Sequence, residues 1–591
     1  MLRDDPLRRV LFVDLSTKSY HVEERPEIFE GSLGGAGAAI RLLDELCPKG
    51  CDPCADENPV IFAVGPLTGL FPLASKTVAF FKSPLTGNLG ESHCGGRSAV
   101  AIRMAGYGGI VITGRSDIPI YLSIDSDGVG FKDARSLWGM GSTSTVGRII
   151  RENESAPGLR TIMRIGRAGE KLVRYAGVTT ETYRHFGRLG LGAVFGAKKL
   201  KAVVVSGKRS LPVTDPKSYR EFYEELYRAA VGSELMRKYH DVGTAENIVP
   251  LNSRGGLPTR NLQSAKFEGA QAISGEAMAE DYLGRRLACS HCPVGCIHIA
   301  ALREPYEDEP YFTKTHMICY DYEPIYALGP MLGIASPRDI LLLMERIEAL
   351  GLDVMSAGVV LAWATEAREK QLISEEETEG IRFAWGDARP YMDALEKIVD
   401  QPNAFYRALA LGVRRASERF GGEDFALSYG GNEMPGYHTG PGAHAGYLLG
   451  LRHSHLDNAG YGVDQKILSE RELPPQELAR LLVDEEVWRQ VLASLVICFF
   501  ARGIYTRETV SRALQLCGFD LGTDDLEPIG RRIYRQKHAF KEREGFSLGA
   551  ERYPKRIFET PSPSALLEQE YMDRVTQAAV EYVNAMQTAE G

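Results

Sequence analysis

Several features are missing from the sequence, and each absence argues against a class of function. It contains no apolar run long enough to span a bilayer, and its first residues enter a predicted strand without the apolar core of a signal peptide. It also lacks an excess of positive charge: its formal net charge is -9, which argues against nucleic acid as the main partner. These absences predict a cytoplasmic protein that has no membrane span and does not act on nucleic acid.

Cysteine is scarce, with ten residues in a chain of 591. In a large chain of a reducing compartment they are expected to be metal ligands or buried thiols rather than a disulfide framework. A complete dinucleotide fingerprint is missing too, because Gly34–Gly37 and Gly190–Gly196 do not have its spacing. Low-complexity segments are absent, and the length predicts two to four globular domains.

Three of the cysteines stand close together in Cys289-Ser-His-Cys292-Pro-Val-Gly-Cys296. Thiolates at this spacing bind one compact soft centre, either an iron–sulfur cluster or zinc. Zinc sites more often use paired CxxC units, and no second CxxC lies near this one in the sequence. Cys498 is the candidate fourth ligand, which would join two distant regions of the chain. A second group, Cys47, Cys51 and Cys54, lies in a Pro/Gly/Asp loop and is interpreted as cysteines of a surface turn.

The pattern of apolar residues predicts an α+β fold. Strand-like runs ending in glycine fill the first third, beginning with a hairpin around Ser16-Thr-Lys18. Helical periodicity follows, with a helix from Pro337 to Leu350 that ends at Gly351. We therefore predict a β-rich N-terminal domain followed by two mainly helical domains, over residues 1–210, 211–415 and 416–591.

Other residue groups favour an anionic cofactor and proton chemistry. The loops at Gly95-Gly96 and Arg184–Arg188 combine glycine with basic side chains, which suits a phosphate-bearing ligand. Glu323 has aromatic neighbours, and burial there would raise the pKa of its carboxyl group. The Gly- and His-rich stretch 430–462 holds four of the twelve histidines and suits either zinc or proton transfer.

These segments, in their order along nearly the whole chain, resemble the aldehyde:ferredoxin oxidoreductase family of tungsten bis-pterin enzymes. The resemblance rests on Gly65-Pro-Leu-Thr-Gly69, Lys82-Ser-Pro-Leu-Thr-Gly87, Ala105-Gly-Tyr107, Trp138-Gly139, Ile165-Gly-Arg-Ala-Gly-Glu170, Gly192–Ala202, Ser274-Gly-Glu-Ala-Met278, the Cys289–Cys296 motif, Tyr322-Glu323, Ala327-Leu-Gly329, Gly351-Leu-Asp353 and Leu495–Cys498.

The resemblance implies that the N-terminal domain is a base for two pterins that hold tungsten or molybdenum. It implies a [4Fe–4S] cluster held by Cys289, Cys292, Cys296 and Cys498, and a Mg²⁺ ion that bridges the pterin phosphates. Glu323 matches the acidic residue beside the metal, and His455 is the predicted partner histidine, with His453 as the alternative. The residues expected to contact the cofactors are Lys76, His93, Gly95, Arg184, His185, Gly187, Arg188, Glu348, Leu352, Asp353, Arg452 and Phe499.

The chain also departs from the family pattern. Lys76 replaces an arginine, which keeps the charge but loses the forked donor. His93 replaces an asparagine near the magnesium, which puts that ion in doubt. The segment Ala493-Ser-Leu-Val-Ile-Cys498 lacks the acidic residue and the glycine of the second pterin motif. No ExxH pair follows Glu323, so a subunit-bridging iron is not supported.

The first functional hypothesis is oxidation of an aldehyde to a carboxylic acid, with electrons passing through the cluster to ferredoxin or an iron–sulfur partner subunit. Such an enzyme is expected to be an oligomer or part of a multi-subunit complex. The second is a low-potential reductase that acts on an aryl-CoA thioester, left open by the aromatic insertion Tyr306–Tyr311. The third is a cluster-only electron-transfer subunit that has lost the pterin.

Overall fold

The computed structural model describes residues 1–155, 158–306 and 308–588. Its contacts divide the chain into two compact units, each assembled from separate stretches. Unit 1 comprises Met1–Arg237, Ala288–Gly295 and Glu486–Phe546; unit 2 comprises Lys238–Leu287, Cys296–Glu485 and Ser547–Gly591. The two units interleave along the chain, whereas three consecutive domains were expected from the sequence; that three-domain division stays a prediction.

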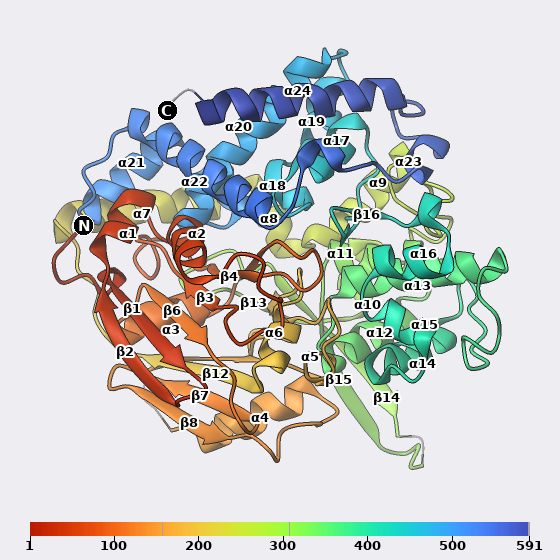
Figure 1. Cartoon of the computed structure of the whole chain (residues 1–591), viewed down its shortest axis with the longest axis horizontal. Helices are drawn as coiled ribbons and strands as arrows, with labels where there is room; N and C mark the ends of the chain where they lie inside the picture. Colours follow the sequence, from red (N-terminus) through yellow and green to blue (C-terminus); the bar gives the residue numbers. More distant parts are fainter. Residues whose placement is uncertain (156–157, 307, 589–591) are drawn as a thin grey trace. The chain divides into compact units, whose positions relative to one another are not determined.

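Unit 1 contains two six-stranded sheets, which occupy the red-to-yellow part of the chain in Figure 1. The first sheet has the order β2-β1-β6-β3-β4-β5, with β1 (Arg9–Asp14), β2 (Ser19–Glu24), β3 (Val60–Ala63), β4 (Thr77–Lys82), β5 (Leu89–Cys94) and β6 (Gly109–Thr113). The expected hairpin is confirmed, because β1 and β2 pair antiparallel from Arg9↔Glu24 to Asp14↔Ser19. Strands β3 and β4 are buried along their whole length, so they form the core of this sheet.

The second sheet carries one of the basic loops. Its order is β11-β10-β9-β12-β7-β8, with β7 (Ile120–Ile124), β8 (Val129–Asp133), β9 (Leu159–Arg164), β10 (Val178–Thr179), β11 (His185–Phe186) and β12 (Leu200–Gly207). Since β11 is an edge strand, the flanking residues Arg184, Gly187 and Arg188 lie at the edge of the sheet.

Helices cover the sheets of unit 1. Helix α2 packs on β3 and β4, and α22, from near the end of the chain, packs on α2. The helices that lie wholly in this unit are α1 (Pro26–Ser32), α2 (Gly35–Leu46), α3 (Ser98–Ala105), α4 (Thr143–Asn153), α5 (Arg167–Glu170), α6 (Leu191–Ala197), α7 (Pro216–Gly232), α21 (Arg507–Leu516) and α22 (Thr523–Arg543). Helices α8 (Glu234–Asp241) and α20 (Pro475–Ser494) cross from one unit into the other.

Unit 2 is mainly helical, as expected. It holds α9 (Ile248–Arg254), α10 (Gly275–Asp281), α11 (Tyr322–Leu328), α12 (Pro337–Leu350), α13 (Val354–Glu369), α14 (Ala388–Asp400), α15 (Ala404–Leu409), α16 (Val413–Phe420), α17 (Pro441–Leu449), α18 (His455–Asn458), α19 (Gly460–Val463), α23 (Arg556–Glu559) and α24 (Gln569–Thr588). Its sheets are β13 (Leu283–Leu287), β14 (Ile297–Pro305) and β15 (Thr313–Tyr320), and the small pair β16 (Ser428–Tyr429) and β17 (Asn432–Glu433). The predicted α+β class is confirmed.

Local sequence explains the bounds of α12, which match the prediction. The Ser336 side chain accepts a hydrogen bond from the backbone of Asp339, and Pro337 opens the first turn. Gly351 ends the helix in the left-handed conformation, with φ of 78°. Helix α13 begins directly after this turn, because Asp353 caps it through the backbone N–H groups of Met355 and Ser356.

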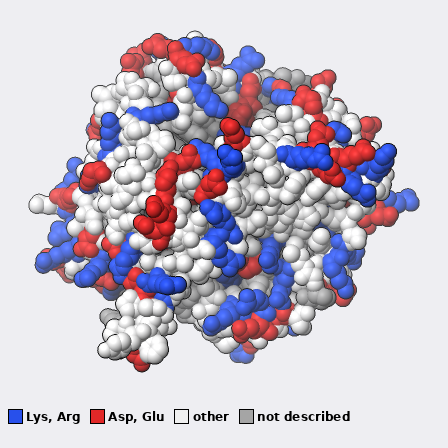
Figure 2. All heavy atoms as spheres, turned by 180° about the vertical axis from the view of Figure 1, so that it is seen from behind, with Lys and Arg blue, Asp and Glu red and all other residues white. Residues whose placement is uncertain are grey.

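No single helix of the described residues has the length and apolarity to cross a membrane, although the sharply bent pair Tyr322–Leu332 and Pro337–Leu350 would pass by length and composition alone. Figure 2 shows basic and acidic side chains interspersed on the face it presents, so the negative net charge is not gathered there into one acidic patch.

Candidate active site

The backbone of Leu73 connects the two cysteine segments of unit 1. Its N–H donates to the carbonyl of His291 (3.2 Å), and its carbonyl accepts from the N–H of Cys498 (2.8 Å). The stretch that carries Cys289 and Cys292 and the stretch that carries Cys498 therefore meet at one residue that is distant from both along the chain. The third cysteine of the motif, Cys296, begins a stretch of unit 2 and directly precedes β14.

Gly95 lies among three residues that were expected near the cofactors. A Cβ at this position would lie 2.9 Å from the sulfur of Cys289, 3.6 Å from Nζ of Lys76 and 3.9 Å from Cγ of Arg184. Only a glycine leaves this space open. The next N–H, of Gly96, donates to the Cys289 sulfur at 3.1 Å, and such bonds stabilise thiolates and cluster sulfurs. The structure thus brings Lys76, Gly95, Arg184 and Cys289 together.

Cys94 lies in this neighbourhood and was not singled out in the sequence. Burial raises the pKa of its thiol to about 12, although Arg184 and Lys76 act in the opposite direction. It is therefore a neutral thiol at physiological pH.

His93 is held by a buried ion-pair network in unit 1. Its Nε2 lies 2.7 Å from Oε1 of Glu91, whose Oε2 lies 2.7 Å from Nζ of Lys537. The Lys537 and Glu91 side chains are 1% and 2% exposed. The His93 ring also lies 6.3 Å from that of Phe499, which carries the guanidinium of Arg489 over its face at 5.2 Å. His93 and Phe499 are therefore neighbours, as expected if both contact the same cofactor.

The described cysteines, histidines and carboxylates form no group of three or more that could hold a single metal ion. This gives no support to zinc at Cys289–Cys296 or in the histidine-rich loop. The ligands of an iron–sulfur cluster stand farther apart than those of one ion, so the finding leaves the cluster hypothesis open.

The residues predicted to act in acid–base chemistry lie in unit 2. Glu323, in the first turn of α11, has its Oε1 3.1 Å from Nε2 of His455 and 3.1 Å from the hydroxyl of Tyr437. The Tyr437 ring stacks on Tyr461 at 4.5 Å and lies 5.2 Å from the His455 ring. Two residues 132 positions apart that were expected to act together are therefore in direct contact.

The expected rise in the pKa of Glu323 is wrong. Burial does oppose ionisation of this carboxyl group, but the hydrogen bond and charge of His455, with help from Tyr437, outweigh it and lower the pKa. Glu323 is thus an ionised acceptor of two hydrogen bonds. Nδ1 of His455 is buried and has no hydrogen-bond partner among the described residues, so this nitrogen is available to a ligand.

His455, and not His453, is the histidine that contacts Glu323. His453 instead lies with Nδ1 3.0 Å from the carbonyl of Tyr447, and its ring packs against Gly430. The turn is shaped by Asp457, which accepts from the backbone of Arg452 and Ser454 (3.0 Å each) and from Nε of Arg452 (2.6 Å). Asp457 therefore positions both Arg452 and His455, and nothing in the sequence pointed to it.

Three residues of unit 2 that were expected to contact a pterin, Glu348, Leu352 and Asp353, lie at the junction of two helices. Glu348 is in the last turn of α12, Gly351 and Leu352 form the turn, and Asp353 caps α13. The Ser356 hydroxyl lies 2.5 Å from Oδ2 of Asp353 and 2.6 Å from Oε2 of Glu433. A structural role as a helix cap is therefore established for Asp353, while its role toward a pterin stays a prediction.

The other two histidines of the stretch 430–462, which the structure folds partly into short helices, form a closed series of hydrogen bonds. Nε2 of His438 must donate to the carbonyl of Thr560 (2.9 Å), so its Nδ1 accepts from Nε2 of His444 (2.7 Å). Nδ1 of His444 then accepts from the hydroxyl of Tyr429 (2.5 Å). Burial lowers the pKa of His438 to about 4 and lowers that of His444 strongly, so both rings are neutral. Because this series of hydrogen bonds ends at a backbone carbonyl, it leads to no proton acceptor. We therefore assign to it a role in the rigidity of the segment and not in proton transfer.

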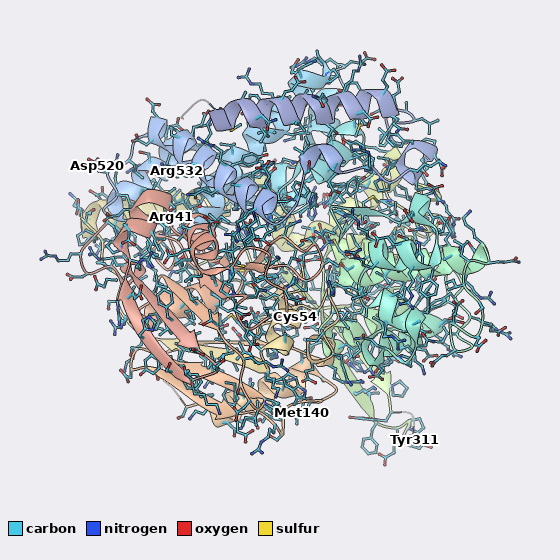
Figure 3. The ribbon with its side chains drawn as sticks, in the orientation of Figure 1. Arg41, Cys54, Met140, Tyr311, Asp520 and Arg532 are labelled. Atoms are coloured by element: carbon cyan, nitrogen blue, oxygen red, sulfur yellow. The ribbon has the colours of Figure 1, made fainter. Side chains whose placement is uncertain are left out.

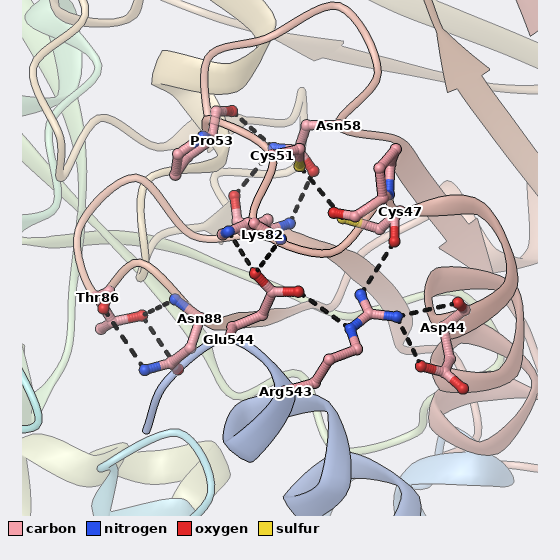
Figure 4. Close-up of polar contacts among 12 residues, drawn as sticks. Asp44, Cys47, Cys51, Pro53, Asn58, Lys82, Thr86, Asn88, Arg543 and Glu544 are labelled. Atoms are coloured by element: carbon pink, nitrogen blue, oxygen red, sulfur yellow. Dashed lines mark hydrogen bonds and ion pairs between the residues drawn. The ribbon is translucent and has the colours of Figure 1, made fainter. Parts of the chain in front are cut away.

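Figure 4 shows the surroundings of the second cysteine group in unit 1. The sulfurs of Cys47 and Cys51 are 3.5 Å apart, and the carbonyl of Cys47 accepts from Arg543 at 3.0 Å. Glu544 binds Lys82 and the N–H of Gly50, so the end of α22 docks on this loop. Cys47 is buried, which makes it part of the packing and not an exposed turn residue.

The described residues of the aromatic insertion of unit 2 lie on the surface. They form the tip between β14 and β15, where Tyr311 is 96% exposed and Phe312 63% exposed. Figure 3 shows the Tyr311 side chain projecting beyond the ribbon at this tip. The part of the insertion that the structure describes, which omits residue 307, therefore gives no support to the reductase hypothesis.

Comparison with known proteins identifies the chain as an oxidoreductase. It belongs to the aldehyde ferredoxin oxidoreductase family: the N-terminal domain of the family matches residues 10–207, and its domains 2 and 3 match residues 220–588. The predicted family and the prediction of an enzyme are confirmed. The first predicted domain boundary, near residue 211, falls between the two matched ranges.

Individual relatives agree with this assignment. The chain is 34% identical over 576 residues to the tungsten-containing aldehyde ferredoxin oxidoreductase of Thermococcus kodakarensis, and 32% identical over 575 residues to that of Pyrococcus furiosus; each match covers 94% of this chain and 92% of the relative. It is 31% identical to the WOR-like subunit of an aliphatic sulfonate oxidoreductase of Pyrococcus furiosus, over 69% of this chain and 66% of that one.

A solved structure supports the fold. The active-site complex BamBC of benzoyl coenzyme A reductase, in complex with 1,5-dienoyl-CoA, superimposes with a TM-score of 0.80 at 21% identity, and the match covers 100% of both chains. At this identity the likeness carries the fold alone.

Proposed function

We propose that the protein oxidises an aldehyde with water to a carboxylic acid, at a tungsten or molybdenum centre held by two pterins. Each turnover releases two protons and two electrons. The electrons leave singly through a [4Fe–4S] cluster to ferredoxin or to an iron–sulfur partner subunit. The proposal is supported by identities above 30% over nearly the full length of tungsten-containing aldehyde ferredoxin oxidoreductases.

The residues present suit these groups. The open space at Gly95, beside the cations Lys76 and Arg184, suits an anionic pterin, and the N–H of Gly96 suits a cluster sulfur on Cys289. The remaining proposed pterin contacts are Arg188, His185, Gly187, Glu348, Leu352 and Arg452. A Mg²⁺ ion bound with the pterin phosphates would lie near His93. When bound, the metal centre accepts the electron pair of the substrate.

The observation that carries the proton chemistry is the contact of Glu323 with His455 and Tyr437. Because Nε2 of His455 donates to the Glu323 carboxylate, its Nδ1 is a lone-pair acceptor in the neutral ring. Nδ1 can then take a proton from water or from a hydrated aldehyde, and the adjacent carboxylate stabilises the imidazolium that results. Tyr437 holds the carboxylate in the orientation that this exchange needs.

The test is Glu323→Gln, assayed with an aldehyde and a viologen dye. We expect kcat to fall by about 10²-fold or more, as for loss of a general acid–base group, with unchanged tungsten or molybdenum and iron per chain. Glu369→Gln, an exposed glutamate of the same unit, is the matched control and should keep full activity. Normal turnover of Glu323→Gln would remove this residue from the mechanism.

The two alternatives have separate tests. Turnover of aryl-CoA esters in place of aldehydes would favour the reductase. Iron without tungsten or molybdenum would favour the cluster-only subunit, for which the incomplete second pterin motif around Cys498 is the support.

A further inference from the structure

Unit 1 contains an arginine-lined cavity that none of the roles above uses. It has a volume of about 410 Å³, and its wall includes Arg97, Arg148, Arg151, Arg160, Arg164 and a single carboxylate, Glu181. Arg148 and Arg151 are three residues apart on α4 and so share one face of that helix. The cavity is thus strongly positive in a chain whose net charge is -9.

The arginines at the rim are available to a partner. Arg97, Arg148 and Arg151 are exposed, and none of the three forms an ion pair with a carboxylate within the described part of the chain. Other exposed arginines do have carboxylate partners, as Arg135 has Asp133 and Arg228 has Glu224. Unpaired guanidinium groups that converge on one hollow favour an anionic partner, whose carboxylates they can bind in pairs.

Backbone adjacent to residues that line this cavity also contacts Cys289. Gly96, whose N–H donates to the Cys289 sulfur, also accepts from the N–H of Ser290 at 2.8 Å, and Arg97 follows directly. On its other side Gly96 packs against Thr182, since a Cβ there would lie 2.1 Å from the Thr182 hydroxyl. Thr182 stands between Glu181 and Tyr183, which both line the cavity.

The inner part of the cavity is rigid. Arg164 is buried and donates from Nε to the carbonyl of Thr143 at 2.6 Å. Oε2 of Glu181 accepts from the N–H of Ile162 (2.8 Å) and from the hydroxyl of Thr161 (3.0 Å). Its carboxylate is therefore fixed to β9, while the free arginines are those at the rim. Such a rim suits a broad acidic surface better than a small ion held deep inside.

We propose that this cavity and its rim are the docking site for an acidic iron–sulfur electron carrier of the ferredoxin type. A carrier bound at Arg97, Arg148 and Arg151 would place its own cluster next to the backbone that contacts Cys289, which is a short path for an electron. The inference rests on the proposed function, because it presumes that electrons leave on the Cys289 side.

The test compares two electron acceptors with one enzyme. Aldehyde oxidation by the wild type and by the double variant Arg148→Glu/Arg151→Glu is measured with a purified oxidised ferredoxin and, separately, with benzyl viologen, which needs no docking site. At low salt we expect KM for ferredoxin to rise about tenfold or more, while viologen-linked kcat stays within about twofold of the wild type. The wild-type KM should also rise with salt toward that of the variant.

Controls separate charge from folding. Arg220→Glu reverses an exposed charge of the same unit on α7 and should leave both assays unchanged. Arg148→Gln/Arg151→Gln should give an intermediate KM, because it removes charge without reversing it. An unchanged ferredoxin KM in the glutamate variant, with viologen activity intact, would overturn the docking site alone. Absence of viologen-linked aldehyde oxidation in the metal-loaded wild type would instead overturn the proposed function.

Discussion

The Glu91–Lys537 pair makes a quantitative prediction about the support of His93. In Lys537→Met the methionine fills similar space, but Glu91 loses its cation while it stays 2% exposed. Removing one partner of a buried ion pair costs about 3–5 kcal/mol. At roughly 2 °C per kcal/mol for a unit of this size, the apparent Tm should fall by about 6–10 °C.

The matched double variant tests the cause. Glu91→Gln/Lys537→Met removes both charges and keeps a side chain that can hydrogen-bond His93, so most of the loss in Tm should be recovered. Thermal unfolding followed by circular dichroism measures both variants, with metal content as a second readout. A single variant within about 1 °C of the wild type, or a double variant no better than the single one, would refute the reasoning.

Two further predictions concern the site itself. Tyr437→Phe removes a hydrogen bond that lowers the pKa of Glu323, so that pKa should rise. Because the ionised carboxylate is lost as pH falls through its pKa, the acid limb of the kcat–pH profile should move to higher pH. An unmoved limb would contradict the role given to Tyr437. Gly95→Ala places a methyl group 2.9 Å from the Cys289 sulfur. Iron per chain, measured by elemental analysis, should therefore fall at least about twofold. A full complement of iron would show that the space at Gly95 tolerates a side chain.

Local signals in the sequence predicted the elements that depend on them. Ser336-Pro337 and Gly351 defined both ends of α12, and Asp215-Pro216 defined the start of α7. Apolar and aromatic residues recur at helical spacing from Tyr219 to Tyr239, but the segment forms two helices separated at Ser233, because apolar periodicity does not report a break between consecutive helices.

Of the candidate site, the sequence predicted only those residues that the family resemblance indicated. The resemblance led to Glu323 and His455, which meet in the fold, but single-sequence patterns cannot show contacts between distant residues. Tyr437 belongs to the stretch 430–462, which was interpreted only for its histidines. Lys537 lies 446 positions from the Glu91 that it binds. The error in the pKa of Glu323 has the same origin, since its aromatic neighbours are adjacent in sequence whereas His455 is not.

The assembly of unit 1 from three stretches of chain has a consequence for biosynthesis. The sheets leave the ribosome early, but the segment that holds Cys498 and the helix that covers α2 belong to Glu486–Phe546. A nascent chain must therefore keep the face of α2 that α22 covers exposed until Thr523–Arg543 has been synthesised. If a cluster uses Cys498, as proposed, its insertion would have to follow the synthesis of Glu486–Phe546 and would act on a unit whose sheets are already made.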